Sequence, residues 1–320
     1  METSSLCANP EVSVIMPSYN TAHLIAASLD SVLAQSFSDF EIIVVNDGSP
    51  DTTELEKVLQ PYLKKIVYIK QENKRAAGAR NSAINQARGK FLAFLDSDDA
   101  WFPDHLAFQM QMFKQGPELD LVYCNCTMGD SRKAQEFMSQ CPSRGPATFL
   151  ALVEERCQIP ISTVVARKSV LEKAGLFDEN LARCDDYDMW VRAAFHGAKI
   201  AYSQRVQARL AGDRPGSLGV SRARMAEAAW KILQKLDQTL PMTDRQRDVV
   251  RKMTNEFYAK YLLEEGKLCL RQRRFDEAQK LLSEANSYLQ SGKLSAVLLG
   301  LSIAPGPTGR LTSLVQRFRE

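Results

Sequence analysis

Two carboxylates separated by one residue follow a buried apolar run in the first third of the chain. The run covers residues 91–95, and Asp96, Ser97 and Asp98 come directly after it. Carboxylate oxygens suit hard divalent cations such as Mg²⁺ or Mn²⁺, which keep several waters and are often shared with substrate phosphates. The same residues also suit an exposed helix N-terminus, where capping and the helix dipole favour Asp. A metal site and a simple helix start are therefore the two interpretations of this turn.

A second polar turn has the sequence Asn-Asp-Gly-Ser at residues 46–49 and also follows an apolar run. Gly48 permits a tight backbone turn. Asp47 could accept a hydrogen bond from a nucleobase or a ribose. The alternative is that this turn caps a helix expected over residues 51–60.

A third acidic group lies far downstream, where Asp185, Asp186 and Asp188 stand within four residues. Deprotonating a hydroxyl requires a carboxylate within hydrogen-bond reach of it, and Asp186 or Asp185 could act in this way. The alternative is an acidic first turn on an ordinary amphipathic helix. Taken alone, this segment does not decide between the two.

The elements that would position these residues alternate along the first 125 residues. Short apolar runs separated by helical patterns indicate βαβ units, and right-handed crossovers then give an open, doubly wound, mostly parallel sheet. In such α/β sheets ligands bind beyond the carboxyl ends of the strands, so we expect the turns at 17–20, 46–49 and 96–99 to meet at one edge. The expected strands are residues 12–16, 41–45, 66–69, 91–95, 121–124 and 161–166, and the expected helices are 23–35, 51–60, 76–88 and 185–196.

These motifs and their order resemble family 2 glycosyltransferases. The resemblance rests on Val-Ser-Val-Ile-Met-Pro-Ser-Tyr-Asn at 12–20, the turn at 46–49, Gly-Ala-Arg-Asn at 78–81, the run at 91–99 and the acidic motif at 185–190. It covers about 200 residues. The family implies a glycosyltransferase A-type fold, a nucleotide-sugar donor (most commonly a UDP-sugar), a Mn²⁺ or Mg²⁺ cofactor and inversion at the anomeric carbon.

The resemblance also implies roles for individual residues. Asp47 would contact the nucleotide base, and Asp98 with Asp96 would hold the metal that bridges the diphosphate. Asp186 would be the general base, while Asp185 stands where the family usually has Glu, so both are candidates. The other nucleotide-binding residues would be Pro17, Tyr19, Asn20, Arg80 and Ser97.

One departure concerns a His that many members carry in a segment after the acidic helix. The corresponding residues 209–218 contain no His. Arg209 or Arg214 could supply the positive charge instead, because guanidinium matches phosphate geometry. Alternatively, the segment is only a linker, or activity has been lost.

Length and composition indicate the class of protein and the compartment in which it works. The 320 residues are 45% hydrophobic and 25% charged, which is typical of a globular chain. Seven cysteines without a Cys-x-x-Cys pair indicate reduced thiols in a cytoplasmic protein. The longest apolar stretch, residues 294–304, is too short to span a membrane, and we expect no secretory signal at the start of the sequence. We therefore expect a cytoplasmic protein, with peripheral association at the inner face of the membrane as an option.

The C-terminal part is expected to be helical. A Gly- and Pro-rich stretch at 207–220 suggests a domain boundary, giving a catalytic domain over 1–215 and a helical region over 216–320. Residues 266–285 weakly resemble a tetratricopeptide hairpin, whose small residues let two helices pack closely. Residues 293–320 form a basic amphipathic end, which could lie on an anionic membrane or pack on protein.

Two competing functions stay open at this point. One is a non-catalytic scaffold that keeps the fold, and the other is a phosphatase, phosphotransferase or nucleotidyltransferase on a similar sheet. The expected partners of the favoured function are a nucleotide-sugar donor and a saccharide, lipid-linked or protein acceptor. No nucleic-acid partner is expected.

Overall fold

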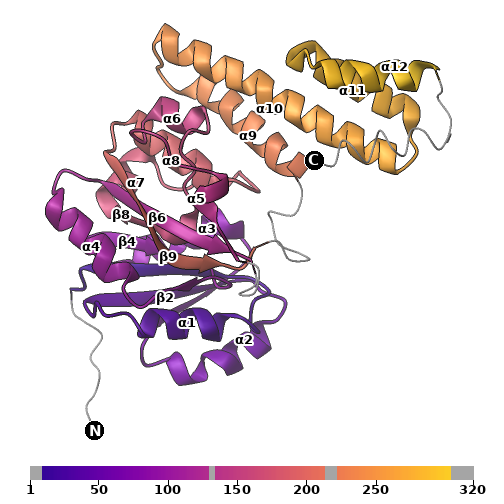
Figure 1. The fold of residues 1–320 in the computed structure, drawn as a ribbon. Helices are drawn as coiled ribbons and strands as arrows, with labels where there is room; N and C mark the ends of the chain where they lie inside the picture. Colours follow the sequence, from indigo (N-terminus) through magenta and orange to yellow (C-terminus); the bar gives the residue numbers. More distant parts are fainter. Residues whose placement is uncertain (1–8, 130–133, 213–221, 304–320) are drawn as a thin grey trace. The chain divides into compact units, whose positions relative to one another are not determined.

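The chain divides into two compact units, residues 1–214 and 215–320 (Figure 1). A computed structural model describes residues 9–129, 134–212 and 222–303.

The described part of the first unit is built on one nine-stranded sheet, in the order β3-β2-β1-β4-β8-β6-β9-β5 with β7 beside β6. The strands β1 to β4 run parallel to one another, and β6 runs parallel to β9. β8 runs antiparallel to both of its neighbours, as do the short strands β5 and β7 to theirs. The strands are β1 (Val12–Ser18), β2 (Phe40–Asp47), β3 (Val67–Gln71), β4 (Phe91–Phe94), β5 (Ala100–Trp101), β6 (Leu121–Met128), β7 (Gln135–Glu136), β8 (Val164–Arg167) and β9 (Ile200–Leu210).

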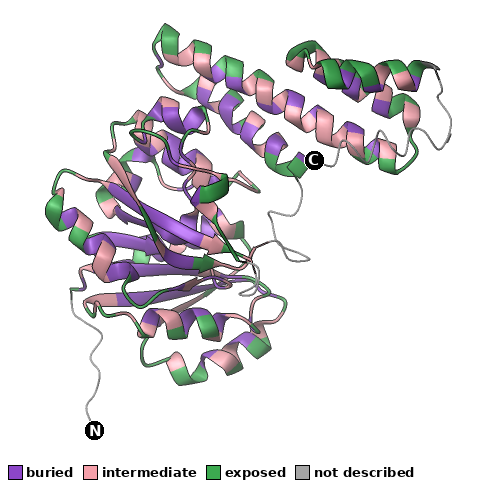
Figure 2. Cartoon of the chain, in the orientation of Figure 1, coloured by how far each residue is buried: buried purple, intermediate pink, exposed green. Residues whose placement is uncertain are grey.

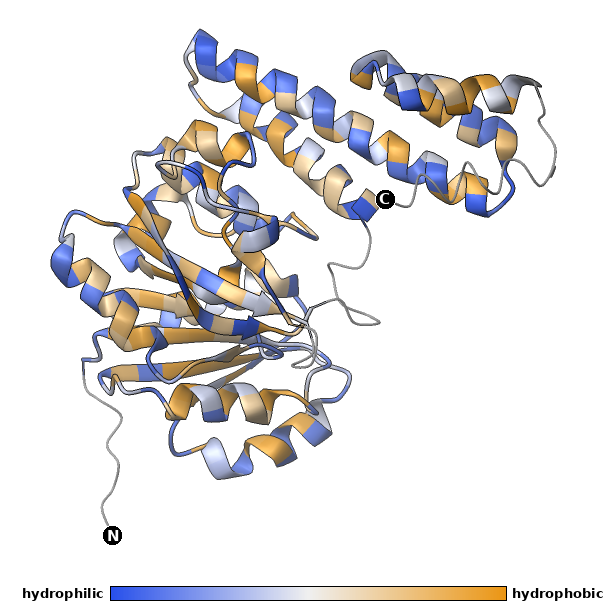
Figure 3. Ribbon diagram, viewed as in Figure 1, coloured by the Kyte–Doolittle hydropathy of each residue, from blue (hydrophilic) through white to orange (hydrophobic). Residues whose placement is uncertain are grey.

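Helices cover both faces of this sheet, because successive residues of a strand point to opposite faces and the central strands are apolar on both. Val12, Val14 and Met16 of β1 pack in one core with residues of α1, α2 and α4. On the other face, the Phe94 ring of β4 contacts Trp190 of α8 edge-on at 5.9 Å. The sheet is accordingly the most buried and hydrophobic part of the unit (Figures 2 and 3). The helices are α1 (Ile25–Leu33), α2 (Thr52–Leu59), α3 (Arg75–Gln86), α4 (His105–Gln115), α5 (Phe137–Gln140), α6 (Phe149–Val153), α7 (Lys168–Ala174) and α8 (Asp185–Phe195), with 3₁₀ turns at Gln60–Tyr62 and Ile161–Thr163.

The expected strands and helices of the first 125 residues are confirmed, with boundaries that move by at most four residues. Two expectations further along need correction. Residues 207–210 belong to β9 and not to a linker, because β9 pairs with β6 along most of its length. Residues 161–163 form a 3₁₀ turn, so the predicted strand at 161–166 starts only at Val164.

The described residues of the second unit are helical, as expected. α9 (Arg222–Thr239), α10 (Asp244–Arg271), α11 (Phe275–Leu289) and α12 (Gly292–Ile303) follow one another along the chain. Thr243 and Gln246 form a capping box that starts α10. At the α10–α11 hairpin, a Cβ on Gly266 would lie 2.6 Å from Leu282 Cδ2, so a larger residue there would force the Leu282 side chain to move.

The basic amphipathic end is only partly described. Leu294, Val297 and Leu301 of α12 are buried in the core of the helical unit, which agrees with the alternative that this part of the segment packs on protein. Residues 304–320 lie outside the described part of the chain. Among the described helices, none combines the length and apolar character needed to cross a membrane.

Candidate active site

The polar turns after β1, β2 and β4 meet at one edge of the sheet, because these three strands are adjacent and parallel. The turns are also bonded to one another. The backbone N–H of Asn20 donates to Ser49 Oγ at 2.6 Å. The hydroxyl oxygens of Thr21 and Ser97 lie 2.7 Å apart. The sequence-predicted convergence of turns 17–20, 46–49 and 96–99 is therefore present.

Asp47 is buried at the end of β2 and fixes the loop that follows β3. Its Oδ1 accepts hydrogen bonds from Gln71 Nε2 and from the backbone N–H of Lys74, both at 2.8 Å. Gly48 has φ +63°, and a Cβ there would lie 2.6 Å from the backbone nitrogen of Asn73. The carboxylate thus faces the β3–α3 loop, which is not the geometry of a helix cap for α2.

Arg80 of α3 joins the turn after β4 to the start of α8. Its Nη2 donates to Asp96 Oδ1 at 2.7 Å and its Nη1 to Asp185 Oδ2 at 2.6 Å. The residue is 4% exposed, and its guanidinium lies 5.7 Å from the ring centre of Phe177. Burial opposes the charge, but the neighbouring carboxylates of Asp185 and Asp96 raise the pKa of Arg80 above its usual value. One buried cation therefore holds two acidic motifs that are far apart in the sequence.

The turn after β4 concentrates negative charge. The side chain of Asp96 is 34% exposed, and Asp98 is half-buried. Asp99 is buried, and it accepts hydrogen bonds from Ser162 Oγ at 2.6 Å and from the backbone N–H of Ala211 at 2.9 Å. Burial, together with the charges of Asp98 and Asp96, raises the pKa of Asp99 to about 8. The partly exposed carboxylates of Asp96 and Asp98 offer oxygen ligands of the kind that Mg²⁺ and Mn²⁺ prefer. The crowded negative charge of this turn favours a cation beside them.

The three carboxylates at the start of α8 have different surroundings. Asp185 is buried and paired with Arg80, whereas Asp188 is paired with Arg192 at 2.7 Å. Asp186 is half-buried and accepts a hydrogen bond from the backbone N–H of Tyr187. Burial and the charge of Asp185 raise the pKa of Asp186 to about 6, against the opposing effect of Arg80. The pKa of Asp186 is thus closer to neutrality than that of an ordinary aspartate.

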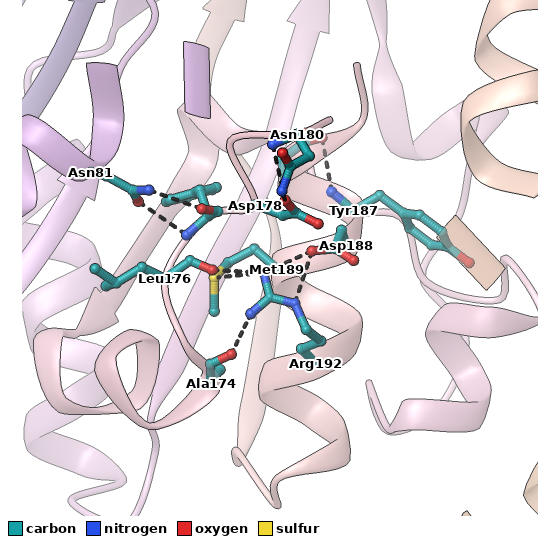
Figure 4. A network of polar contacts seen from close by, with 11 residues as sticks. Asn81, Ala174, Leu176, Asp178, Asn180, Tyr187, Asp188, Met189 and Arg192 are labelled. Carbon is teal, nitrogen blue, oxygen red and sulfur yellow. Dashed lines mark hydrogen bonds and ion pairs between the residues drawn. The ribbon is translucent and has the colours of Figure 1, made fainter. Parts of the chain in front are cut away.

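The start of α8 is held by the network shown in Figure 4. Arg192 lies one turn beyond Asp188, and its guanidinium donates to that carboxylate and to the backbone carbonyls of Ala174 and Leu176. These bonds tie α8 to the loop after α7. They explain why Asp188 is structural, although the sequence groups it with Asp185 and Asp186.

Some contributing residues were not singled out from the sequence. Asn81 donates to the Phe177 carbonyl at 2.9 Å and accepts from the Phe177 N–H at 3.0 Å, which steadies the ring beneath Arg80. Ser162 donates to Asp99, and it also accepts from the Asp96 N–H at 3.1 Å. Nothing in the sequence marks Ser162, because its partners lie more than 60 residues away.

The remaining predicted residues are spread around this edge. Pro17 is half-buried in β1 opposite Val45, and Tyr19 is 52% exposed. Arg209 is exposed within β9, opposite Ala100, so it belongs to the sheet and not to a linker. Arg214 lies outside the described residues.

Comparison with known proteins agrees with this geometry. The family model for glycosyl transferase family 2 matches residues 13–170. The chain is 35% identical over 181 residues to an Escherichia coli protein, UDP-Glc:alpha-D-GlcNAc-diphosphoundecaprenol beta-1,3-glucosyltransferase WfgD, covering 56% of this chain and 68% of that one. The chain belongs to glycosyltransferase family 2. It is also 32% identical over 188 residues to an uncharacterized glycosyltransferase of Rickettsia prowazekii, spanning 58% of the length of each protein.

Solved structures share the family 2 fold. The mannosyltransferase PcManGT of Pyrobaculum calidifontis, solved with GDP-Man and Mn²⁺, gives a TM-score of 0.63 at 19% identity, covering 97% of this chain and 86% of that one. TarS 1-349 of S. aureus, solved with UDP, gives 0.59 at 20% identity, covering 90% and 83%. The chain spans half of the longer TarS structure. These likenesses confirm the predicted glycosyltransferase A-type fold.

Proposed function

We propose that the protein transfers a sugar from a nucleotide-sugar donor to a hydroxyl acceptor, with inversion at the anomeric carbon. A UDP-sugar is the favoured donor. The observation that carries this proposal is the double ion pair of Arg80, which brings Asp96 and Asp185 to the same edge of the sheet. This contact supports a donor site at the turn after β4 with a candidate base beside it. The similar proteins named above act on or were solved with UDP-Glc, UDP and GDP-Man, which supports a nucleotide-sugar donor.

The donor would bind across the turns after β1, β2 and β4. Asp47, fixed at the end of β2, would accept a hydrogen bond from the base. The other residues of this nucleotide site would be Pro17, Tyr19, Asn20, Asp96 and Ser97. Because both Nη atoms of Arg80 are already engaged by carboxylates, its role would be to orient Asp96 and Asp185 next to the diphosphate.

Asp98 and Asp96 would hold a Mn²⁺ or Mg²⁺ ion at the diphosphate. Two partly exposed carboxylates fit such an ion, which commonly completes its shell with water and substrate phosphates. When bound, the ion supplies Lewis-acid stabilisation of the leaving nucleoside diphosphate. Arg209 or Arg214 would add positive charge to the same group, in place of the His found in many members.

Asp186 would act as the general base, and Asp185 would position it. Asp185 is engaged by Arg80, whereas Asp186 has a pKa near neutrality, as a base working near pH 7 requires. The acceptor oxygen would bond to the anomeric carbon as the bond from that carbon to the β-phosphate oxygen breaks. The hydroxyl proton would pass to the Asp186 carboxylate, and the electron pair would leave with the nucleoside diphosphate.

The acceptor would be a saccharide, a lipid-linked molecule or a protein, in cell-envelope polysaccharide or glycoconjugate synthesis. The named WfgD relative acts on a diphosphoundecaprenol-linked sugar, which supports a lipid-linked acceptor. Such a reaction would take place in the cytoplasm, at the inner face of the membrane.

Product analysis tests this function. The protein would be incubated with UDP-glucose, UDP-N-acetylglucosamine or GDP-mannose, Mn²⁺, and a panel of saccharide, lipid-linked and peptide acceptors. The proposal predicts release of free nucleoside diphosphate with one donor, an inverted anomeric configuration by NMR, and loss of both in Asp186→Asn. Release of inorganic phosphate or pyrophosphate instead, or no nucleoside diphosphate across the panel, would contradict it.

A further inference from the structure

The helical unit carries a hollow of its own. It has a volume of about 300 Å³ and lies between α9 and α10. The residues that line it are all of polar types and come from both helices: Gln234, Asp237, Gln238, Arg251, Thr254 and Asn255. A polar hollow of this size can take a small hydrophilic ligand.

A row of aromatic rings continues this hollow along the same two helices. The Trp230 ring lies 4.8 Å from Tyr258 and 6.0 Å from Tyr261, with the Trp230 and Tyr261 planes within 21° of parallel. On α9, Trp230 stands one turn from Gln234, and on α10, Tyr258 stands one turn from Thr254. Residues four apart share a helix face, so rings and hollow form one continuous strip.

Ion pairs hold the two helices of the strip together, while several of its polar side chains are open to a ligand. Asp237 is bonded by Arg247 and by Arg251 Nε at 3.0 Å, which ties α9 to α10. In contrast, the exposed amides of Gln234, Gln238 and Asn255 make no hydrogen bond within the described part of the chain. Each amide offers both donors and an acceptor to a ligand.

We propose that this strip, residues Trp230, Gln234, Gln238, Asn255, Tyr258 and Tyr261, binds a neutral oligosaccharide. The C–H bonds on a pyranose face carry partial positive charge and suit the negative face of an aromatic ring. The hydroxyls around the pyranose match the amides, which both donate and accept. A neutral ligand is favoured over an anionic one, because the Asp237 carboxylate balances part of the positive charge of Arg247 and Arg251.

The bound saccharide would be the acceptor chain or its elongated product, and this assignment rests on the proposed function. The saccharide chemistry itself depends only on the strip. A second binding site for the growing chain would keep the acceptor near the enzyme between transfers, as linked sites raise the effective concentration.

Binding is measured on the full chain by tryptophan fluorescence, with cellotetraose and chitotetraose as probes. Of the three tryptophans, Trp101 and Trp190 are buried at 5% and 2% exposure, so Trp230 is the half-buried reporter. We expect saturable binding of at least one probe. The double variant Gln234→Ala/Asn255→Ala should weaken it about tenfold, since two hydrogen bonds are lost. Gln279→Ala on α11, which removes an amide outside the strip, is the matched control and should bind like the parent.

The outcomes separate this inference from the proposed function. Inorganic phosphate is titrated as an alternative ligand, and UDP binding is followed in parallel. Saccharide binding that is weakened in the double variant supports the strip even if no nucleotide binds. Absence of saturable binding of both probes, equal binding by the double variant and the control, or a response to phosphate alone would overturn it, whatever the result with UDP.

Discussion

Replacing Arg80 tests the arrangement of the sheet edge, because Arg80→Met keeps the length of the side chain and removes its charge. The substitution leaves Asp185, whose side chain is 10% exposed, without its cation. Removing one partner of a buried pair costs about 3–5 kcal/mol, because a buried charge stays uncompensated. Asp96 is 34% exposed and should add little, as exposed pairs contribute about 0–1 kcal/mol. We therefore expect a loss of about 3–5 kcal/mol in the free energy of unfolding.

Urea denaturation followed by circular dichroism measures this loss, and the matched control is Arg156→Met. Arg156 pairs with Glu154 at 2.8 Å, but both side chains are more than a third exposed. The control should change the unfolding free energy by less than about 1 kcal/mol. The double variant Arg80→Met/Asp185→Asn should recover stability, since the buried charge is gone, without recovering sugar transfer. A loss in Arg80→Met no larger than in the control, or a double variant as unstable as the single one, would refute this account of Arg80.

Three further predictions concern individual residues of the site. Asp186 must be ionised to act as the base, and its pKa is raised to about 6, so kcat/KM should fall about tenfold per pH unit below pH 6. Asp186→Asn should abolish this fall at low pH. It should also lower kcat by a factor of about 10²–10⁴ and leave the affinity for the nucleotide unchanged. A pH profile that is flat from 5 to 7 would count against that role. Asp47→Ala should weaken UDP binding by at least about tenfold in calorimetry, because it removes a hydrogen bond to the base and the bond that Asp47 accepts from the Lys74 N–H. Unchanged affinity would exclude Asp47 from the nucleotide site. Gly48→Ala should lower the melting temperature, because φ is +63° and the new Cβ would lie 2.6 Å from Asn73 N; a melting temperature equal to that of the parent would show that the turn can relax.

The sequence predicts the sheet edge well, because its signals are local. An apolar run of four to six residues followed by a polar turn occurs at β1, β2 and β4, and parallel neighbours bring such turns together. The carboxylates Asp47, Asp96 and Asp98 could be singled out on that ground alone.

The contacts that complete the site are non-local, and no pattern shows them. Arg80 pairs with Asp185, which lies 105 residues further along the chain, and Asp99 accepts a hydrogen bond from the Ala211 N–H, 112 residues away. β9 carries polar residues at several positions, such as Gln204 and Arg205, so its pattern does not indicate a strand, although pairing with β6 makes it one. In the same way, the strip on α9 and α10 depends on how two helices pack, and sequence spacing alone defines only one face of each.

Nucleotide binding tests the central claim most directly. Isothermal titration calorimetry would be run with UDP, GDP, dTDP and CDP, each with and without Mn²⁺, on the parent and on Asp98→Asn. The account predicts that one nucleotide binds with an affinity that depends on Mn²⁺, and that this dependence disappears in Asp98→Asn while the variant melts like the parent. If no nucleotide binds to the cooperatively folded parent, or if Asp98→Asn responds to Mn²⁺ as the parent does, the proposed donor and metal site are wrong.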